Sequence, residues 1–240
     1  MAYTEPIHAA VLTFSCFAEG NVGMKIEQNQ IAKDGKNRAL NQNDLLILRN
    51  YLLRKGVIPI GSDDSYMLSY ADSKEEPAAW CLVLKNGIKH FGVDKDVLLD
   101  QIQNIPVVDK QMLNTRQGKV MTKHKRHNFN IGDKNVAADI PTGQSTLYDF
   151  NSPFLSEAKK LRDAFTDLGE KLPFLGTMKN LLAEANVYYA DEYKKNQYCG
   201  IGYHGDAERP NSPVIGCNVG KTRYLSFRSS LLPPRFQHRY

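Results

Sequence analysis

A histidine and an aspartate stand two positions apart in the last part of the chain, as His204 and Asp206. Residues at this spacing project from the same face of a β-strand, and Gly205 between them places nothing bulky on the opposite face. An imidazole beside a carboxylate supplies two of the three protein ligands of a site that holds Fe(II) and leaves positions open for O₂ and a chelating co-substrate. We therefore predict a neutral His204 and an ionised Asp206 as metal ligands. Taken alone, the spacing also suits a surface pair without metal.

The neighbouring residues extend the pattern into an ordered block: His204-Gly205-Asp206-Ala207-Glu208-Arg209, Ser212-Pro213-Val214-Ile215-Gly216, Gly220 and Tyr224-Leu225-Ser226-Phe227-Arg228. This block resembles one stretch of the AlkB-like Fe(II)/2-oxoglutarate dioxygenases. The resemblance implies a double-stranded β-helix, a relative of the jelly roll, with Fe(II) as the metal and 2-oxoglutarate as co-substrate. It also implies oxidative hydroxylation or demethylation of alkylated nucleic-acid bases, which such enzymes reach by flipping the base or by using single strands.

Upstream of the block, Asn186-Val187-Tyr188 looks like the family's N-x-Y, so the resemblance implies that Asn186 and Tyr188 contact 2-oxoglutarate. The sequence departs from the family after the block. The family's second metal histidine and its carboxylate-binding arginines come later, whereas here the one later histidine is His238, which we do not expect to be the third ligand. We expect instead a chain that stops inside its catalytic domain. An inactive binding or interaction module with the same fold remains the alternative.

The net charge of +5 comes entirely from residues 121–240, since residues 1–120 contain equal numbers of basic and acidic residues. A basic segment can face a polyanion, so nucleic acid is a candidate partner. A nucleic-acid-binding protein that uses the basic loop 119–127, and needs no iron, is therefore a further alternative. The candidate contacts are Lys123, Lys125, Arg126, Arg209, Arg223 and Arg228.

Two other patterns bear on chemistry and location. His124 and His127 have a spacing that suits a metal on a helix, but no Cys or carboxylate partner is close, which favours structural or exposed histidines. The four cysteines are scattered, without a CxxC pair, and no basic flank precedes the apolar residues 9–14. We therefore predict an intracellular protein of a reducing compartment, cytoplasm or nucleus. No apolar run reaches the roughly 20 residues of a membrane-spanning helix.

The elements that must position these residues indicate an α+β protein. We predict an N-terminal α/β accessory region over residues 1–115 and a partial, jelly-roll-like double-stranded β-helix over residues 116–240. Residues 1–115 also look like a region of uncharacterised proteins of large DNA viruses of algae, so the resemblance implies that a virus could encode the protein. Apolar spacing predicts helices over residues 45–55, 97–102, 156–168 and 177–185, and strands over 9–14, 80–84, 88–93, 187–189, 200–204, 213–219 and 224–227. Residues 109–139 are predicted as a polar connection.

Overall fold

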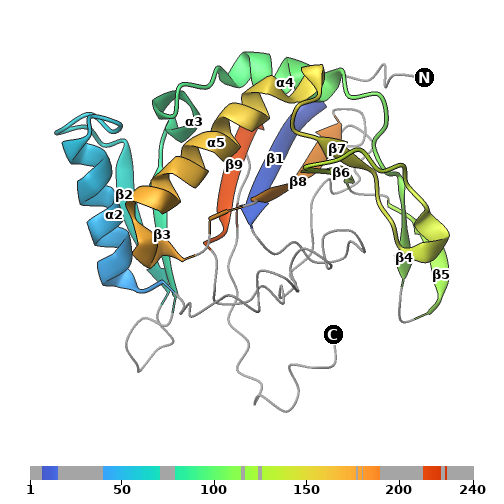
Figure 1. Ribbon diagram of the computed structural model, residues 1–240, viewed down its shortest axis with the longest axis horizontal. Helices are drawn as coiled ribbons and strands as arrows, with labels where there is room; N and C mark the ends of the chain where they lie inside the picture. The colour runs from blue at the N-terminus through green and yellow to red at the C-terminus, as the bar shows by residue number, and fades with distance from the viewer. Residues whose placement is uncertain are drawn as a thin grey trace, which may run out of the picture.

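The computed structural model describes residues 7–15, 40–70, 79–114, 117–123, 126–176, 178–179, 181–189, 213–222 and 225. A mixed five-stranded sheet lies at its centre, in the order β7-β6-β8-β1-β9 (Figure 1). The strands are β1 (Ile7–Ser15), β6 (His127–Gly132), β7 (Leu147–Asp149), β8 (Leu182–Tyr189) and β9 (Ile215–Gly220). β6 and β7 are parallel, and the other neighbours are antiparallel.

The first strand of the chain, β1, lies in the middle of this sheet. It pairs with β8 on one side and with β9 on the other, so that Leu12 stands opposite both Ala185 and Cys217. Ala9, Ala10, Leu12 and Phe14 are almost fully buried, which confirms the predicted buried strand. The sheet therefore joins strands from both sides of the expected boundary at residue 115, and so does the main hydrophobic core.

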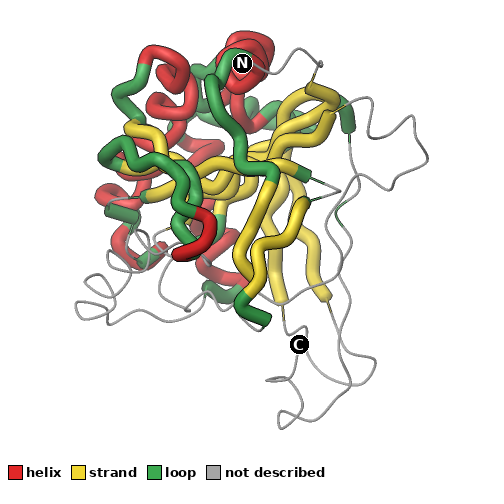
Figure 2. The backbone as a smooth tube through the Cα atoms, turned by 90° about the vertical axis from the view of Figure 1, so that its right-hand side faces the viewer, coloured by secondary structure: helices red, strands yellow, loops and turns green. Residues whose placement is uncertain are grey.

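The α-helices of the described residues are α2 (Gln42–Arg54), α3 (Gly87–His90), α4 (Lys95–Gln103) and α5 (Ser156–Lys171). The same residues also form the short 3-10 helices η1 (Ile140–Thr142), η2 (Pro153–Leu155) and η3 (Pro173–Leu175). The helices gather on one side of the strands (Figure 2). The predicted apolar face of α5 is confirmed, because Leu161, Phe165 and Leu168 are buried. The ring of Phe165 meets those of Phe14 and Phe91 edge-on, with centroids 5.3 and 5.1 Å apart.

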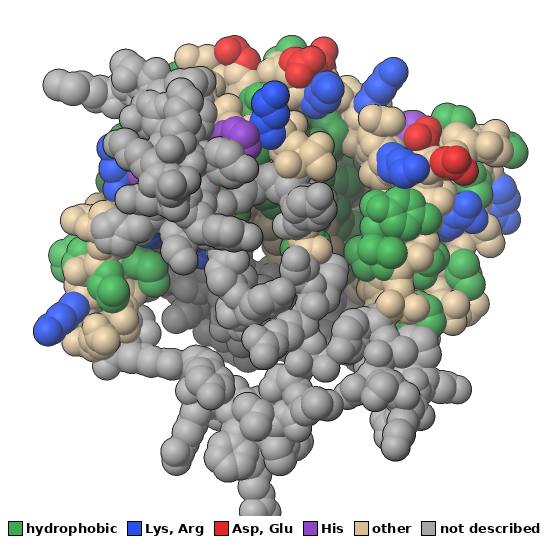
Figure 3. All heavy atoms as spheres, turned by 180° about the vertical axis from the view of Figure 1, so that it is seen from behind, with side chains coloured by type: hydrophobic (Ala, Val, Ile, Leu, Met, Phe, Trp, Pro, Cys, Tyr) green, Lys and Arg blue, Asp and Glu red, His purple; other side chains and the backbone are tan. Residues whose placement is uncertain are grey.

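Two antiparallel hairpins flank the central sheet at opposite ends (Figure 1). β2 (Ser65–Tyr70) pairs with β3 (Ala79–Leu84) beside α2, and β4 (Gln111–Asn114) pairs with β5 (Lys119–Thr122) at the other end. Apolar side chains reach the surface at both ends of the molecule (Figure 3). On the β4–β5 hairpin they are Met112, Val120 and Met121.

Three predicted elements are wrong. Residues 88–93 do not pair with 80–84, because Asn86, with φ 54°, leads into the short helix α3, and β3 pairs with β2 instead. The predicted helix 177–185 is wrong, because residues 182–185 form the first half of β8, which continues through the predicted strand 187–189. The side chains of β8 are buried on both faces of the sheet, so that tertiary packing outweighs the helix propensity of its Leu, Ala and Glu residues. The predicted polar connection 109–139 contains β4, β5 and the fully buried β6.

The predicted helices at 45–55 and 97–102 and the strand at 213–219 are confirmed, with bounds shifted by a few residues. The helix α2 begins earlier than expected, since Asn41 is its N-cap and forms a capping box with Asp44. The α+β class is confirmed, and the described sheet neither closes nor curls into a barrel. Among the described helices, none has the length and apolar character needed to cross a membrane.

Candidate functional site

The two faces of the central sheet differ in chemistry. On β8, Ala183, Ala185 and Val187 belong to the apolar core on the helix side, so that the alternate residues project from the opposite face. On β6, Phe129 and Ile131 likewise belong to the core. We call the opposite face of these two strands the polar sheet face; its residues are Arg126, Asn128, Asn130, Glu184, Asn186 and Tyr188.

The strand register brings these polar side chains into rows. Asn128 stands opposite Asn186, and Asn130 stands opposite Glu184. Across the diagonal, the Nδ2 of Asn128 donates a hydrogen bond to the Oε1 of Glu184 at 3.1 Å. Asn128, Asn130, Asn186 and Tyr188 are all buried. Because buried polar groups are costly unless they are hydrogen-bonded, such a face is retained only where polar contacts satisfy it.

Arg126 completes the row at the start of β6. Its Nη1 donates a hydrogen bond to the Oδ1 of Asn186 at 2.7 Å, across 60 positions of sequence. Since that amide oxygen accepts from the guanidinium, the Nδ2 group of Asn186 points away from it and can donate elsewhere. The alternation along β6 and β8 places Arg126 on the same face as Tyr188, next to Asn186.

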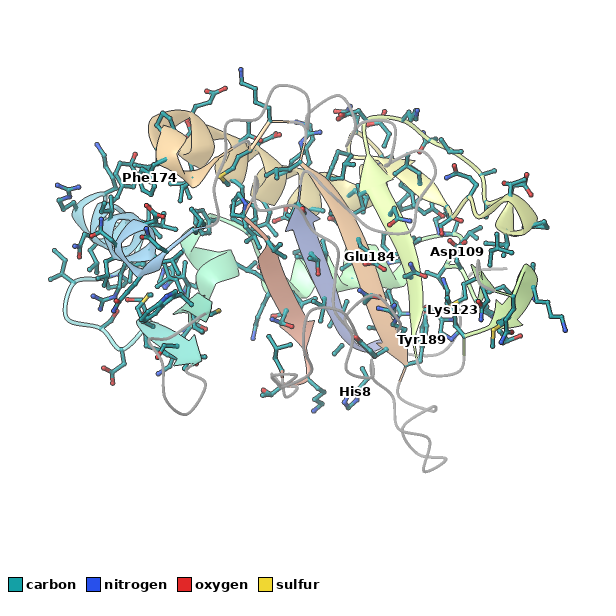
Figure 4. The ribbon with its side chains drawn as sticks, turned by 90° about the horizontal axis from the view of Figure 1, so that it is seen from below. His8, Asp109, Lys123, Phe174, Glu184 and Tyr189 are labelled. Carbon is teal, nitrogen blue, oxygen red and sulfur yellow. The ribbon has the colours of Figure 1, made fainter. Side chains whose placement is uncertain are left out.

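A second cation, Lys123, lies at the edge of the polar sheet face (Figure 4). Its Nζ donates to the Oδ1 of Asn128 and, at 3.4 Å, to the backbone oxygen of Asp109. The pKa of Lys123 is lowered to about 8, chiefly by burial and in a smaller part by the charge of Arg126, although the carboxylates of Asp109 and Glu184 oppose the shift. Lys123 is therefore a partly desolvated ammonium inside a polar network, and its ammonium group is already bound there.

The carboxylate of Asp109 is occupied by another part of the chain. It accepts hydrogen bonds from the backbone nitrogen of Thr146 at 2.8 Å and from its Oγ1 at 2.6 Å. Both residues are buried, so Asp109 ties the strand edge to the segment before β7. The chemistry of three groups on this face, the amide of Asn186, the hydroxyl of Tyr188 and the guanidinium of Arg126, suits a carboxylate, because all three can donate hydrogen bonds.

The structure brings together part of the predicted site. Asn186 and Tyr188 lie on one face of β8, and Arg126 and Lys123, predicted as nucleic-acid contacts, lie beside them in the polar network. The other predicted residues lie outside the described residues: His204, Asp206, His238, Lys125, Arg209, Arg223 and Arg228. His204 and Asp206 follow Tyr188 in the sequence, in the part of the chain between β8 and β9.

The side chains of His127 and Cys217 do not add a reactive group to the polar sheet face. His127 projects to the core side, where its ring meets that of Tyr189 edge-on with centroids 5.3 Å apart. Burial raises the pKa of Cys217 to about 12, so its thiol stays protonated and is a poor nucleophile. In the part of the chain that the structure describes, no three His, Cys, Asp or Glu side chains are grouped as metal ligands.

The chain is similar to an uncharacterized protein of Acanthamoeba polyphaga mimivirus. The two are 27% identical over 226 residues, which cover 94% of this chain and 79% of the relative. The similarity thus runs through both halves of the sequence, and its viral source is in keeping with the viral origin considered above. No family model and no solved structure matches the chain.

Proposed function

We propose that this chain is an Fe(II)/2-oxoglutarate-dependent dioxygenase domain that binds its co-substrate on the polar sheet face. One observation carries the proposal: Asn186 and Tyr188 project from the same buried face of β8, and a guanidinium is bonded to Asn186. This is the arrangement expected of residues that contact a carboxylate co-substrate.

The topology supports the same proposal. β8 and β9 both run antiparallel to β1, so they are parallel to each other, with one strand between them. The connection from the end of β8 to the start of β9 carries His204 and Asp206. In the proposal, the five-stranded sheet is the larger sheet of a partial double-stranded β-helix, and the polar sheet face is its inner side.

The roles of the chain's own residues follow from their chemistry. His204 binds the metal through a neutral ring nitrogen, and Asp206 binds it as a carboxylate. In the proposal, Asn186 and Tyr188, which are each 5% exposed, orient 2-oxoglutarate by hydrogen bonds. Iron(II), when bound, supplies the O₂ activation that couples decarboxylation of 2-oxoglutarate to hydroxylation of a substrate C–H bond.

The proposed substrate is an alkylated nucleic-acid base, taken from a single strand or flipped from a duplex. The excess of basic residues in positions 121–240 is compatible with a polyanionic substrate. Because Lys123 and Arg126 are bonded within the polar network, contacts to the phosphate backbone in this proposal come from other basic residues.

The test is iron-dependent conversion of 2-oxoglutarate to succinate by the purified chain. Because we expect no third metal ligand in this sequence, turnover by the wild type should be weak, and it should be lost in His204→Ala and in Asp206→Ala. The matched control is Asp63→Ala, the same substitution at an exposed loop residue, and it should keep full turnover. Absence of succinate from the wild type, or turnover that survives His204→Ala, would contradict the proposal. Tight, salt-sensitive binding of nucleic acid without any need for iron would favour the binding-protein alternative.

A further inference from the structure

The helix α2 carries apolar residues on two of its faces. Leu45 and Leu52 are buried in the core, whereas Leu46 and Ile47 stay 38% and 39% exposed. Beside the helix, Ile60 of the loop that follows it is 85% exposed. A surface helix buries one apolar stripe against its own core, so a second apolar stripe at the surface indicates a contact with another molecule.

Two of these exposed side chains, Ile47 and Ile60, line a groove of about 650 Å³ between α2 and the loop. We call it the α2 groove; its lining includes Ile47, Arg49, Leu53, Arg54, Ile60 and Ser62. Its volume lies in the range of protein ligand sites. Ile47 and Arg54 are seven positions apart, so the groove follows the helix for two turns, or about 10 Å. It lies at the opposite end of the molecule from the β4–β5 hairpin (Figure 1).

Two arginines give the α2 groove its charge. The Nε of Arg49 donates a hydrogen bond to the Oγ of Ser65 at 2.9 Å, which holds the guanidinium between α2 and β2. The four N–H donors of its two Nη groups remain for a ligand. Arg54 is exposed in the last turn of α2. In the part of the chain that the structure describes, neither arginine has a carboxylate partner.

No acidic side chain of the described residues lines the α2 groove. The next acidic residues along the chain are Asp63 and Asp64, and the Oδ2 of Asp64 lies 3.5 Å from the Nε2 of His90. A groove with aliphatic walls and two positive charges is complementary to an aliphatic side chain beside carboxylates. A second copy of this chain fits less well, because a two-fold axis at the groove would bring the arginines of both copies together. Single-stranded nucleic acid stacks its bases on aromatic side chains, and the described lining has none.

We propose that the α2 groove binds an acidic peptide segment of a partner protein, in which a leucine or isoleucine lies between aspartate or glutamate residues. The aliphatic side chain of the peptide packs on Ile47, Leu53 and Ile60. Its carboxylates bind the guanidinium groups of Arg49 and Arg54 through paired hydrogen bonds. The hydrogen bond to Ser65 holds Arg49 in place, so less freedom is lost when the peptide binds. Binding at this groove depends on neither iron nor 2-oxoglutarate.

The test selects random short peptides displayed on phage against the purified chain and measures the selected sequences, as fluorescein-labelled synthetic peptides, by fluorescence anisotropy. We expect these sequences to share a leucine or isoleucine flanked by acidic residues. Arg54→Glu should weaken their binding by about 10- to 100-fold, the usual effect of losing a hydrogen bond between charged groups. Ile60→Ser should weaken it by about 10-fold through lost apolar burial. The controls are Lys119→Glu and Val107→Ser, at exposed positions outside the groove, and they should leave binding unchanged.

A charge reversal on both sides tests the contact directly. A selected peptide whose acidic residues are replaced by lysine should bind Arg54→Glu more tightly than it binds the wild type. Selection of no peptide, of peptides without acidic residues, or of peptides that bind both groove variants as tightly as the wild type would overturn the inference. If the wild type is instead a dimer in analytical ultracentrifugation that Ile60→Ser dissociates, the occupant is a second copy and the peptide proposal fails. It fails equally if the wild type binds no acidic peptide but binds an oligo-dT strand that Arg54→Glu releases.

Discussion

Replacing Lys123 by methionine removes the ammonium group at the edge of the polar sheet face while keeping an unbranched side chain. Burial lowers the pKa of Lys123 from its ordinary value of 10.5 to about 8 in the folded protein. Between these two pH values the unfolded chain binds more protons than the folded chain. The free energy of unfolding of the wild type therefore rises with pH through that window, and below about pH 8 the full cost of burying the charge is present.

The size of this effect follows from the difference between the two pKa values. It corresponds to about 3 kcal/mol at most, and the partial exposure of the side chain reduces the expected rise to about 1–2 kcal/mol. Lys123→Met cannot show this rise. It also loses the hydrogen bonds to Asn128 and Asp109, a loss that is the same at every pH and shifts the whole curve without changing its slope.

The assay is urea unfolding followed by far-UV circular dichroism at several pH values from 7 to about 10.5. We expect the stability difference between wild type and Lys123→Met to grow in favour of the wild type above pH 8. Lys119→Met, at an exposed position on β5, is the control and should give a curve parallel to that of the wild type. Parallel curves for Lys123→Met and wild type would refute the assignment of Lys123 as a desolvated ammonium.

Two more predictions concern the packing that supports the sheet. Gly220→Ala should destabilise the protein by about 1–3 kcal/mol, because Gly220 has φ +84° and an added Cβ would lie 2.7 Å from the backbone oxygen of His8. Gly216→Ala on the same strand is the control: its Cβ would meet nothing within 4 Å, so stability should change by about 0.5 kcal/mol or less. Thermal unfolding of both variants checks this prediction, and equal effects would contradict it. Phe165→Ala should lower the free energy of unfolding, measured in urea, by about 3–5 kcal/mol, because its ring is buried against Phe14. The same substitution at the exposed Phe154 should lower it by less than about 1 kcal/mol. A loss below about 1.5 kcal/mol at Phe165 would contradict the packing of α5 on the core.

The elements that could be predicted from the sequence are those with a clear apolar period. The helix α5 has three apolar residues on one face and a polar opposite face, and β1 is a short apolar run, so both were expected. The strand β8 is predicted only at its end, over residues 187–189. Its first half is predicted as helix, because it is buried on both faces and so lacks the alternation that marks a half-exposed strand. Asn86-Gly87 suggested a hairpin turn, yet the positive φ of Asn86 begins a helical turn equally well.

The polar sheet face could be predicted only in part. Asn186 and Tyr188 were expected as co-substrate contacts, and their spacing alone places them on one face of a strand. The polar residues His127, Asn128 and Asn130 predict a polar connection where the structure has the strand β6, because the sequence does not indicate that all three are buried. The sequence predicts Arg126 at a nucleic-acid surface and does not predict its contact with Asn186. That contact depends on the pairing of β6 with β8, across 60 positions of sequence, which no local pattern indicates.

The most direct test of the central claim is equilibrium dialysis of 2-oxoglutarate against the purified chain with and without Mn(II). If the co-substrate binds to the polar sheet face beside a metal held by His204 and Asp206, Mn(II) should tighten 2-oxoglutarate binding, and 2-oxoglutarate should tighten Mn(II) binding by the same factor. Asn186→Ala should weaken retention of 2-oxoglutarate, and His204→Ala should abolish the dependence on Mn(II). Retention that is indifferent both to the metal and to Asn186→Ala would contradict the account.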